Sequence, residues 1–243
     1  MIDGLTLLLP HIGYPTGSFK APMIYNPWFE RRGVNAVVVP MAVTADGFAS
    51  VMQALTHTRN VRGALITMPH KVAVVDLLAE RSTTVEIAGS CNAVLRRDDG
   101  TFAGDNFDGT GFARGLARKG FRVAGSRCLV VGAGGVGSAI AAALAADGAS
   151  SIAVSDVDPA SADGLARRLR RHYPSIDVAI ATNDPAGYDL AVNATPLGMN
   201  AGDPAPFEGS LLHAGQWAFD CVYGHGETAF ARANAVYDTT IGW

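Results

Sequence analysis

The sequence has no long run of like charges and no long apolar run. Its 19 basic and 22 acidic side chains are scattered and give a formal net charge of −3, so the chain lacks the basic patch of a nucleic-acid-binding protein. No stretch reaches the ~20 apolar residues that a membrane-spanning helix needs. The first residues, MIDGLTLLLP, have neither the basic region nor the cleavage site of a signal peptide. These absences predict a cytoplasmic protein without a nucleic-acid or membrane partner.

Cysteine is also scarce. Cys91, Cys128 and Cys221 are far apart and odd in number, which argues against a disulfide framework and against a tetrahedral metal site. We expect buried, reduced thiols and no metal. By contrast, apolar residues are abundant: they make up 49% of the chain, and charged residues only 17%. Such a chain can bury enough surface to offset the entropy lost on folding, so we expect an ordered protein.

Short apolar runs alternate with helical patterns along the chain. The runs are LTLLL, VNAVVVP, RGALITMP, RCLVVGAGG, SIAVSD, YDLAVNATP and QWAFDCVY. This alternation predicts an α/β protein with parallel sheets and crossover helices. Because the runs are continuously apolar, both faces of each sheet should be covered.

One segment interrupts this pattern. Residues 101–109 read TFAGDNFDG, and a helical pattern follows from Asp108 to Lys119. A chain of 243 residues is long enough for two modest domains, since single cores stop growing near roughly 250 residues. We therefore predict two domains, residues 1–107 and 108–243.

A glycine-rich loop in the second half indicates a dinucleotide site. Residues 128–139 read CLVVGAGGVGSA, with G-x-G-x-x-G spacing between an apolar strand and a helical pattern. The glycines permit a tight turn, a close approach of backbone to pyrophosphate and close helix packing, and the helix N-terminus attracts the phosphate charge. Without this context, the three glycines would be explained as well by a structural turn. The predicted cofactor-binding residues of this loop are Gly132, Ala133, Gly134, Gly135, Val136 and Gly137.

Asp156 ends the next apolar run, about 20 residues after the last glycine, where a carboxylate can accept hydrogen bonds from the adenosine ribose. A carboxylate would repel the 2′-phosphate of NADP, so we predict NAD, with NADP the less favoured cofactor. The competing observation is a basic cluster that could clamp that phosphate. We assign it to the end of a helix, where cations are favoured by the helix dipole. The cluster comprises Arg167, Arg168, Arg170 and Arg171.

Five segments carry a resemblance to a known family. ITMPHK, GSCNAV, GDNFDGTG, GAGGVG and NATPLGM resemble, in order and spacing, segments of the shikimate and quinate dehydrogenases. The resemblance implies a substrate-binding and catalytic α/β domain at 1–107 and a Rossmann NAD-binding domain at 108–243. It also implies an oxidoreductase that transfers a hydride between nicotinamide and a ring secondary alcohol or ketone of a shikimate- or quinate-like hydroxy acid.

The resemblance assigns roles to individual residues. It makes Lys71 and Asp108 the catalytic pair, and the chemistry needs such a pair because alcohol oxidation releases a proton to a base. Lysines suit this role since they lose proton affinity readily when desolvated. The other roles implied are substrate binding by Thr67, Asn92 and Tyr223, and contact with nicotinamide by Thr195 and Met199. Each residue alone has an ordinary explanation: Asp108 as a helix cap, Asn92 as a turn residue.

The chain departs from the family at two places. An S-x-S-P or S-x-T-P segment, whose hydroxyls hold the substrate carboxylate, is replaced in GYPTGSFKAP, where Ser18 remains and Lys20 or Ala21 takes the second position. Losing one donor costs about 1–3 kcal/mol unless it is replaced. Either Lys20 supplies a charged bond instead, or the pocket takes quinate, an aminoshikimate or another polyol acid. The final residues, VYDTTIGW, stand where the resemblance implies a last helix that returns to the first domain. Either the sequence shown omits this tail, or the helix is absent and the protein has lost one wall of its cleft.

Three alternatives stay open at this point. The chain could be a regulatory module that binds NAD but has lost its chemistry, because fold alone does not establish activity. It could be a related two-lobed NAD(P) enzyme that acts on a folate or an amino acid, although the five segments argue against this. Strands of the first domain could also pair to form a homodimer.

Overall fold

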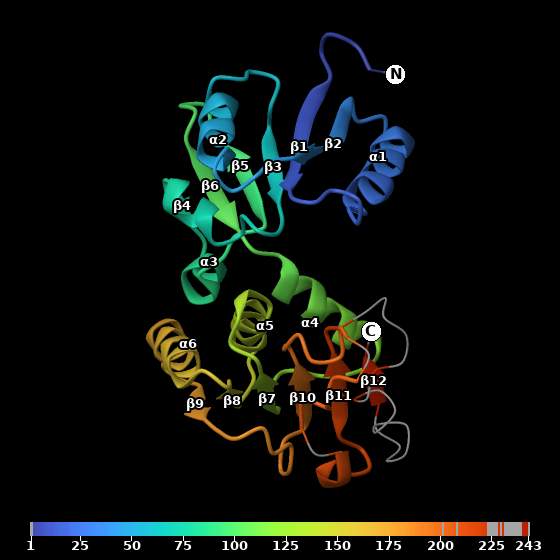
Figure 1. Cartoon of the computed structure of the whole chain (residues 1–243). Coiled ribbons are helices and arrows are strands. Elements are labelled where there is room, and N and C mark those ends of the chain that lie inside the picture. Colours follow the sequence, from blue (N-terminus) through green and yellow to red (C-terminus); the bar gives the residue numbers. More distant parts are fainter. Residues whose placement is uncertain are drawn as a thin grey trace. The chain divides into compact units, whose positions relative to one another are not determined.

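A computed structural model describes residues 2–200, 202–207, 209–222, 228, 230 and 240–242. The chain divides into two compact units, Met1–Phe107 and Asp108–Trp243, and each contains one sheet (Figure 1). Within the described residues, no helix has the length and apolar character needed to cross a membrane.

The first unit contains a six-stranded sheet in the order β2-β1-β3-β5-β6-β4. Its strands are β1 (Leu7–Gly13), β2 (Ala36–Ala42), β3 (Gly63–Ile66), β4 (Glu80–Arg81), β5 (Ala93–Arg96) and β6 (Phe102–Asp105), and its helices are α1 (Ala21–Arg32), α2 (Phe48–Thr56), the 3₁₀ turn η1 (Ala73–Leu77) and α3 (Thr83–Ala88).

This first sheet corrects the expectation of parallel sheets throughout. β1 runs parallel to β2 and β3, but β5 runs antiparallel to both β3 and β6. For β5 and β6 the reason is a tight turn, in which the Arg97 N–H donates to the Thr101 carbonyl at 2.8 Å. Gly100 closes this turn with a φ of +90°. A connection this short reverses the chain, whereas parallel neighbours need a long crossover.

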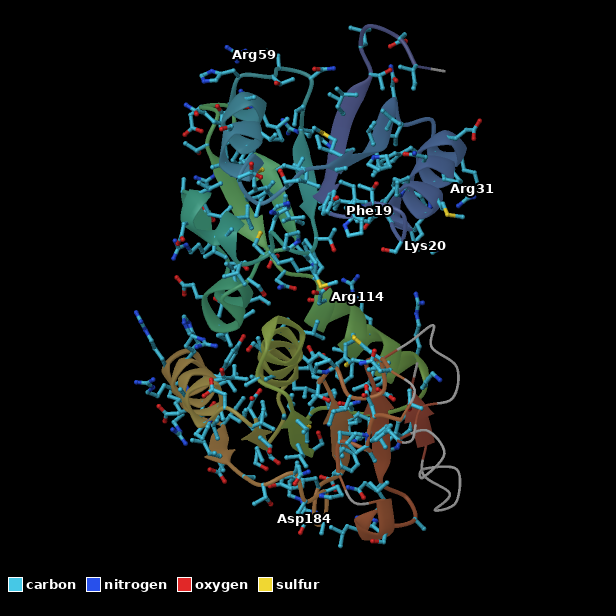
Figure 2. The ribbon with its side chains drawn as sticks, in the orientation of Figure 1. Phe19, Lys20, Arg31, Arg59, Arg114 and Asp184 are labelled. Atoms are coloured by element: carbon cyan, nitrogen blue, oxygen red, sulfur yellow. The ribbon has the colours of Figure 1, made fainter. Side chains whose placement is uncertain are left out.

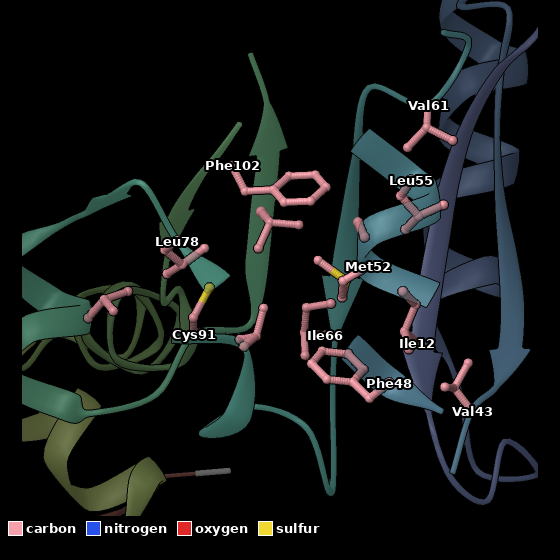
Figure 3. Close-up of a cluster of buried hydrophobic side chains, with 14 residues drawn as sticks. Ile12, Val43, Phe48, Met52, Leu55, Val61, Ile66, Leu78, Cys91 and Phe102 are labelled. Carbon is pink, nitrogen blue, oxygen red and sulfur yellow. The ribbon is translucent and has the colours of Figure 1, made fainter. Parts of the chain in front are cut away.

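The core of the first unit lies between its sheet and α2. Phe48, Met52 and Leu55 share one face of α2 and pack with Ile12 of β1 and Ile66 of β3 (Figure 3). All five side chains are buried, because their spacing along helix and strand puts them on facing surfaces.

Helix α1 is attached differently, since none of its residues is buried. The Asn26 side chain accepts from the Val38 N–H at 2.7 Å and donates to the Val38 carbonyl at 3.1 Å. It therefore pairs with edge strand β2 as another strand would, and it satisfies two backbone groups that lack a strand partner on that side.

The second unit contains a six-stranded sheet in the order β12-β11-β10-β7-β8-β9, and every neighbouring pair runs parallel. Its strands are β7 (Arg127–Val131), β8 (Ser151–Ser155), β9 (Asp177–Ile180), β10 (Leu190–Asn193), β11 (Trp217–Asp220) and β12 (Thr240–Gly242), and its helices are α4 (Asp108–Arg118), α5 (Gly135–Ala146), α6 (Pro159–His172) and the 3₁₀ turn η2 (Gly209–Leu211). The predicted α/β class with a Rossmann-like second sheet is confirmed.

Two helices of the second unit approach each other closely. At Gly109 of α4, an added Cβ would clash with the backbone carbonyl of Ala139 in α5. Glycine at this position lets the two backbones pack directly against each other. The start of α4, immediately after the first unit, is thereby fixed on α5.

Candidate active site and dinucleotide site

Four chain segments meet at one edge of the first sheet. β1 and β3 are parallel and end there, while antiparallel β5 begins there and β6 ends there. The loops at this edge therefore contain residues 14–20, residues 67–71, Asn92 and Phe107. In sheets of this kind, ligands bind beyond the carboxyl ends of the parallel strands. The topology thus gathers most of the site residues predicted for the first unit.

Backbone hydrogen bonds hold the loop that carries Lys71. The Thr67 N–H donates to the Ile12 carbonyl at 2.9 Å, and the Cys91 N–H donates to the Lys71 carbonyl at 2.8 Å. Thr67 and Lys71 are both partly buried. The Lys71 backbone is therefore hydrogen-bonded to Cys91, the residue before Asn92, although Lys71 and Cys91 are distant in sequence.

His70 anchors the same loop, a role that the sequence analysis missed. Its ring is buried, stacks on Phe48 with ring centroids 4.2 Å apart, and places Nε2 at 2.7 Å from the Val43 carbonyl. Because a carbonyl only accepts, Nε2 carries the hydrogen. No sequence signal separated this buried histidine from a surface one.

Asn92 joins two strand ends. Its backbone carbonyl accepts from the Ile66 N–H at 2.8 Å, and its side-chain oxygen accepts from the Phe107 N–H at 3.0 Å. Asp108 follows Phe107 directly and opens α4 in the second unit. The Asn92 side chain therefore orients the segment that leads to Asp108.

The loop after β1 places Phe19 against His11, a residue of β1 near this edge. Their ring centroids lie 4.1 Å apart, and Phe19 is partly buried while Ser18 and Lys20 are exposed. Burial lowers the pKa of His11, and the positive charge of Lys71 lowers it further. Both effects favour the neutral form of the His11 ring.

Neither residue of this pair was predicted from the sequence. Counted back from Pro22, the two hydroxyl positions of the family's S-x-S-P segment fall on Phe19 and Ala21, and neither residue has a hydroxyl. That register could have identified Phe19. For His11, the signal was a histidine within the apolar run LLLPHIG, where a polar side chain is unexpected.

In the second unit, the glycine loop has the form that a dinucleotide needs. Gly132 has a φ of +105°, and a Cβ there would lie 2.7 Å from the Ala194 carbonyl. At Gly137, a Cβ would clash with the Gly132 carbonyl oxygen. A Cβ added at Gly134 would have no neighbouring atom within 4 Å, so the exposed start of α5 is open to a phosphate group. These residues fit a bound pyrophosphate.

Asp156 holds this loop from the neighbouring strand. Its Oδ2 accepts from the Ala133 N–H at 2.6 Å, and its Oδ1 accepts from the Asp158 N–H at 2.8 Å. From the sequence, Asp156 was predicted to bind the ribose only, and this bond to the loop was not foreseen. The partly buried carboxylate is thus fixed beside the glycines by two backbone donors.

The arginines that could suggest a phosphate clamp lie on α6, as predicted, with Leu165 and Leu169 of that helix buried. Arg170 donates through Nε and Nη2 to the Val178 carbonyl at 3.1 and 2.6 Å. Arg167 pairs with Asp163 at 3.1 Å on an exposed face. Both arginines thus have partners in or beside their own helix.

The NATPLGM segment forms a closed turn after β10. Asn193 is buried and donates to Asp220 at 3.0 Å, and its side-chain oxygen accepts from the Thr195 hydroxyl at 2.7 Å. Met199 is 48% exposed. The turn therefore has its own hydrogen bonds and leaves Met199 accessible, while the predicted Tyr223 lies outside the described residues.

Comparisons with known proteins show which proteins this chain is similar to. A family model described as the shikimate dehydrogenase substrate binding domain matches residues 12–94, and one described as the ThiF family matches residues 118–178. A shikimate dehydrogenase (NADP⁺) of Rubrobacter xylanophilus is 37% identical over an alignment of 239 residues, which covers 96% of this chain and 83% of the relative.

Two solved structures are also similar. A quinate dehydrogenase from Corynebacterium glutamicum in complex with NAD is 30% identical, with a TM-score of 0.84 over 97% of this chain and 87% of that one. A 5-ketofructose reductase of a Gluconobacter strain is 26% identical, with a TM-score of 0.85 over 97% of this chain and 86% of that one.

Proposed function

Because this chain belongs to the shikimate dehydrogenase family, we propose that it transfers a hydride between NAD and a ring secondary alcohol or ketone of a shikimate- or quinate-like compound. The chain is an NAD(P)-dependent oxidoreductase that acts on a CH–OH group. The observation that carries the proposal is the edge of the first sheet, where backbone bonds hold Lys71 beside the Cys91–Asn92 segment.

Bound NAD would supply the hydride acceptor. We assign proton transfer to Lys71. Its neutral amine accepts the hydroxyl proton as the carbonyl forms. Asp108 would hold the reacting hydroxyl and Lys71 in register. Thr67 and Asn92 would hydrogen-bond the other ring hydroxyls, and Asn92 is suited to this because its amide is oriented by Phe107.

The remaining predicted residues complete the assignment. Ser18 and Lys20 lie on the exposed loop before α1 and would meet the substrate from that side. We keep the assignment of Tyr223 to substrate binding, although this residue lies outside the described part of the chain. Thr195 and Met199 would border the nicotinamide, for which the closed turn after β10 gives a fixed backbone.

We propose NAD as the preferred cofactor. The support is the fixed Asp156 carboxylate beside the glycine loop, which would repel a 2′-phosphate. The relatives' own names are divided: the Rubrobacter enzyme is named for NADP⁺, and the quinate dehydrogenase holds NAD. Steady-state kinetics with both cofactors tests this assignment, and a higher kcat/KM with NADP would remove it.

A substrate scan with a lysine variant tests the proposed reaction. Formation of NADH is followed with shikimate, quinate, aminoshikimate and their neutral analogues. Lys71→Ala should lower kcat by roughly 10²-fold or more, the usual contribution of acid–base catalysis, and leave NAD affinity unchanged. The exposed Lys119→Ala is the matched control and should keep full activity. Full turnover in Lys71→Ala would exclude Lys71 as the base, and NAD binding without any turnover would favour the regulatory module.

A further inference from the structure

Phe19 stands at the first hydroxyl position of the family's S-x-S-P segment, counted back from Pro22, and it lies at the end of β1. Its Cζ lies 2.8 Å from the position that a Cβ on Gly13 would take, and the Thr67 methyl group lies against the same face of Gly13. Phe19 and Thr67 therefore cover the end of β1 together. Figure 2 shows Phe19 at this end of the first unit, with Lys20 farther along the loop.

His11 extends the apolar surface beneath Phe19. The two rings are inclined by 33°, and the buried His11 Nδ1 has no hydrogen-bond partner among the described residues. Burial and the Lys71 charge both lower the pKa of His11, so the imidazole is neutral near neutral pH. The tilted pair thus presents ring surface and no positive charge.

The polar residues beside Phe19 do not change this surface. Ser18 and Lys20 flank Phe19 in sequence but are exposed, whereas Phe19 is partly buried. Ala21, which begins α1, contributes only a methyl group. The charged group shown to act on His11 is Lys71, which the proposed function assigns to the reacting hydroxyl.

We propose that Phe19 and His11 form an aromatic wall of the substrate site that selects uncharged cyclic or sugar-like polyols, and their ketones, over the corresponding carboxylic acids. The inference rests on the proposed function and narrows its substrate class. A carboxylate pressed against this wall would lose water and would find no hydroxyl at residues 19 and 21, which is costly. The C–H face of a polyol ring would lose little water and would gain contact with the phenyl ring.

The test uses two ligands that differ only at the acid group. One is shikimate, and the other is the same ring with a hydroxymethyl group in place of the carboxylate. Calorimetry on the full chain with NAD bound gives both dissociation constants, and kinetics gives both kcat/KM values. We expect the neutral compound to bind about tenfold more tightly or better, which corresponds to the loss of one hydrogen bond to a buried group.

Variants of Phe19 test whether the aromatic wall causes the preference for the neutral ligand. Phe19→Ser should shift the affinity ratio toward the acid by about tenfold, because it supplies a hydroxyl and space for water. Phe19→Leu keeps an apolar wall and should keep the preference. Tyr14→Ser is the matched control in the same loop, since Tyr14 is exposed, and it should leave the ratio unchanged.

The outcomes separate this inference from the proposed function. Tighter binding of the acid by the unsubstituted protein overturns the proposed wall, even if Phe19→Ser does not fold. An affinity ratio of neutral compound to acid that is the same in Phe19→Ser as in the unsubstituted protein also overturns it. Binding of neither ligand overturns it as well. Selective binding of the neutral compound without turnover supports the wall and removes the proposed reaction.

Discussion

Lys71 and His11 come from different loops and strands, yet the charge of one changes the titration of the other. The Lys71 ammonium group disfavours a second positive charge on the His11 ring, in addition to the effect of burial. The pKa of His11 therefore reports whether the Lys71 charge lies near the His11 ring, and it can be measured without substrate. A turnover assay alone does not show where Lys71 lies.

Lys71→Met should raise the pKa of His11, because it removes the positive charge and leaves burial in place. The value should stay below the ordinary 6.5. Titration of the histidine ring protons by NMR measures it. Lys20→Met is the control, since Lys20 is not among the groups that shift His11. An unchanged His11 in Lys71→Met would mean that Lys71 does not lie near this ring.

The sequence suggested many single residues but not their partners. Lys71, Asp108 and Asn92 stood out through family motifs, and their catalytic and binding roles stay predictions. The contacts of His11, Phe19 and His70 could not be found in this way, because each depends on residues far away in sequence. Stacking of His70 on Phe48, for example, requires α2 to pack beside the loop that follows β3.

At the scale of elements, two glycines of α4 give a matched pair. An added Cβ at Gly109 would meet the backbone of Ala139, whereas at Gly111 nothing lies within 4 Å. Gly111→Ala should therefore raise the free energy of unfolding by up to about 1 kcal/mol through helix propensity. Gly109→Ala should lower it by about 1–3 kcal/mol, because α4 and α5 must separate.

Urea denaturation of both variants measures this difference. Equal effects of the two substitutions would show that the close contact between α4 and α5 is absent in solution. The comparison is well controlled because both residues lie in the first turn of the same helix and receive the same methyl group.

Elements with a strong pattern were predictable, and short or mixed ones were not. The helix expected from Asp108 to Lys119 is observed as α4, Asp108–Arg118. β5 and β6 have only four residues each and include Arg96 and Asp105, so no apolar run revealed them. Without them, the antiparallel part of the first sheet could not be foreseen. Helix α1 also lacked a signal, because Asn26 rather than an apolar face attaches it to β2.

At the scale of the whole chain, each unit has its own buried core. One cluster contains Ile12 and Ile66 of the first unit, and another contains Leu129 and Ala191 of the second. A ligand held by the glycine loop should therefore stabilise the second core directly. Binding to the folded form alone at 100 times Kd contributes about 2.7 kcal/mol.

Hydrogen exchange with and without NAD tests this prediction. Core amides of β7 and β10 that exchange through unfolding of the second unit should slow by about 100-fold at that concentration. Amides of β1 and β3 in the first unit serve as the internal control and should change little. Equal slowing in both units would show that the chain unfolds as one cooperative body.

The double use of Asp156 limits how this chain could exchange one cofactor for another. A small neutral residue at that position would remove the repulsion of a 2′-phosphate, but it would also leave the Ala133 N–H without its acceptor and loosen the turn that both cofactors require. A redesign for NADP therefore needs two coordinated changes, one that admits the phosphate and one that restores an oxygen to the loop. Single substitutions at Asp156 should give a weaker enzyme for both dinucleotides rather than a switched one.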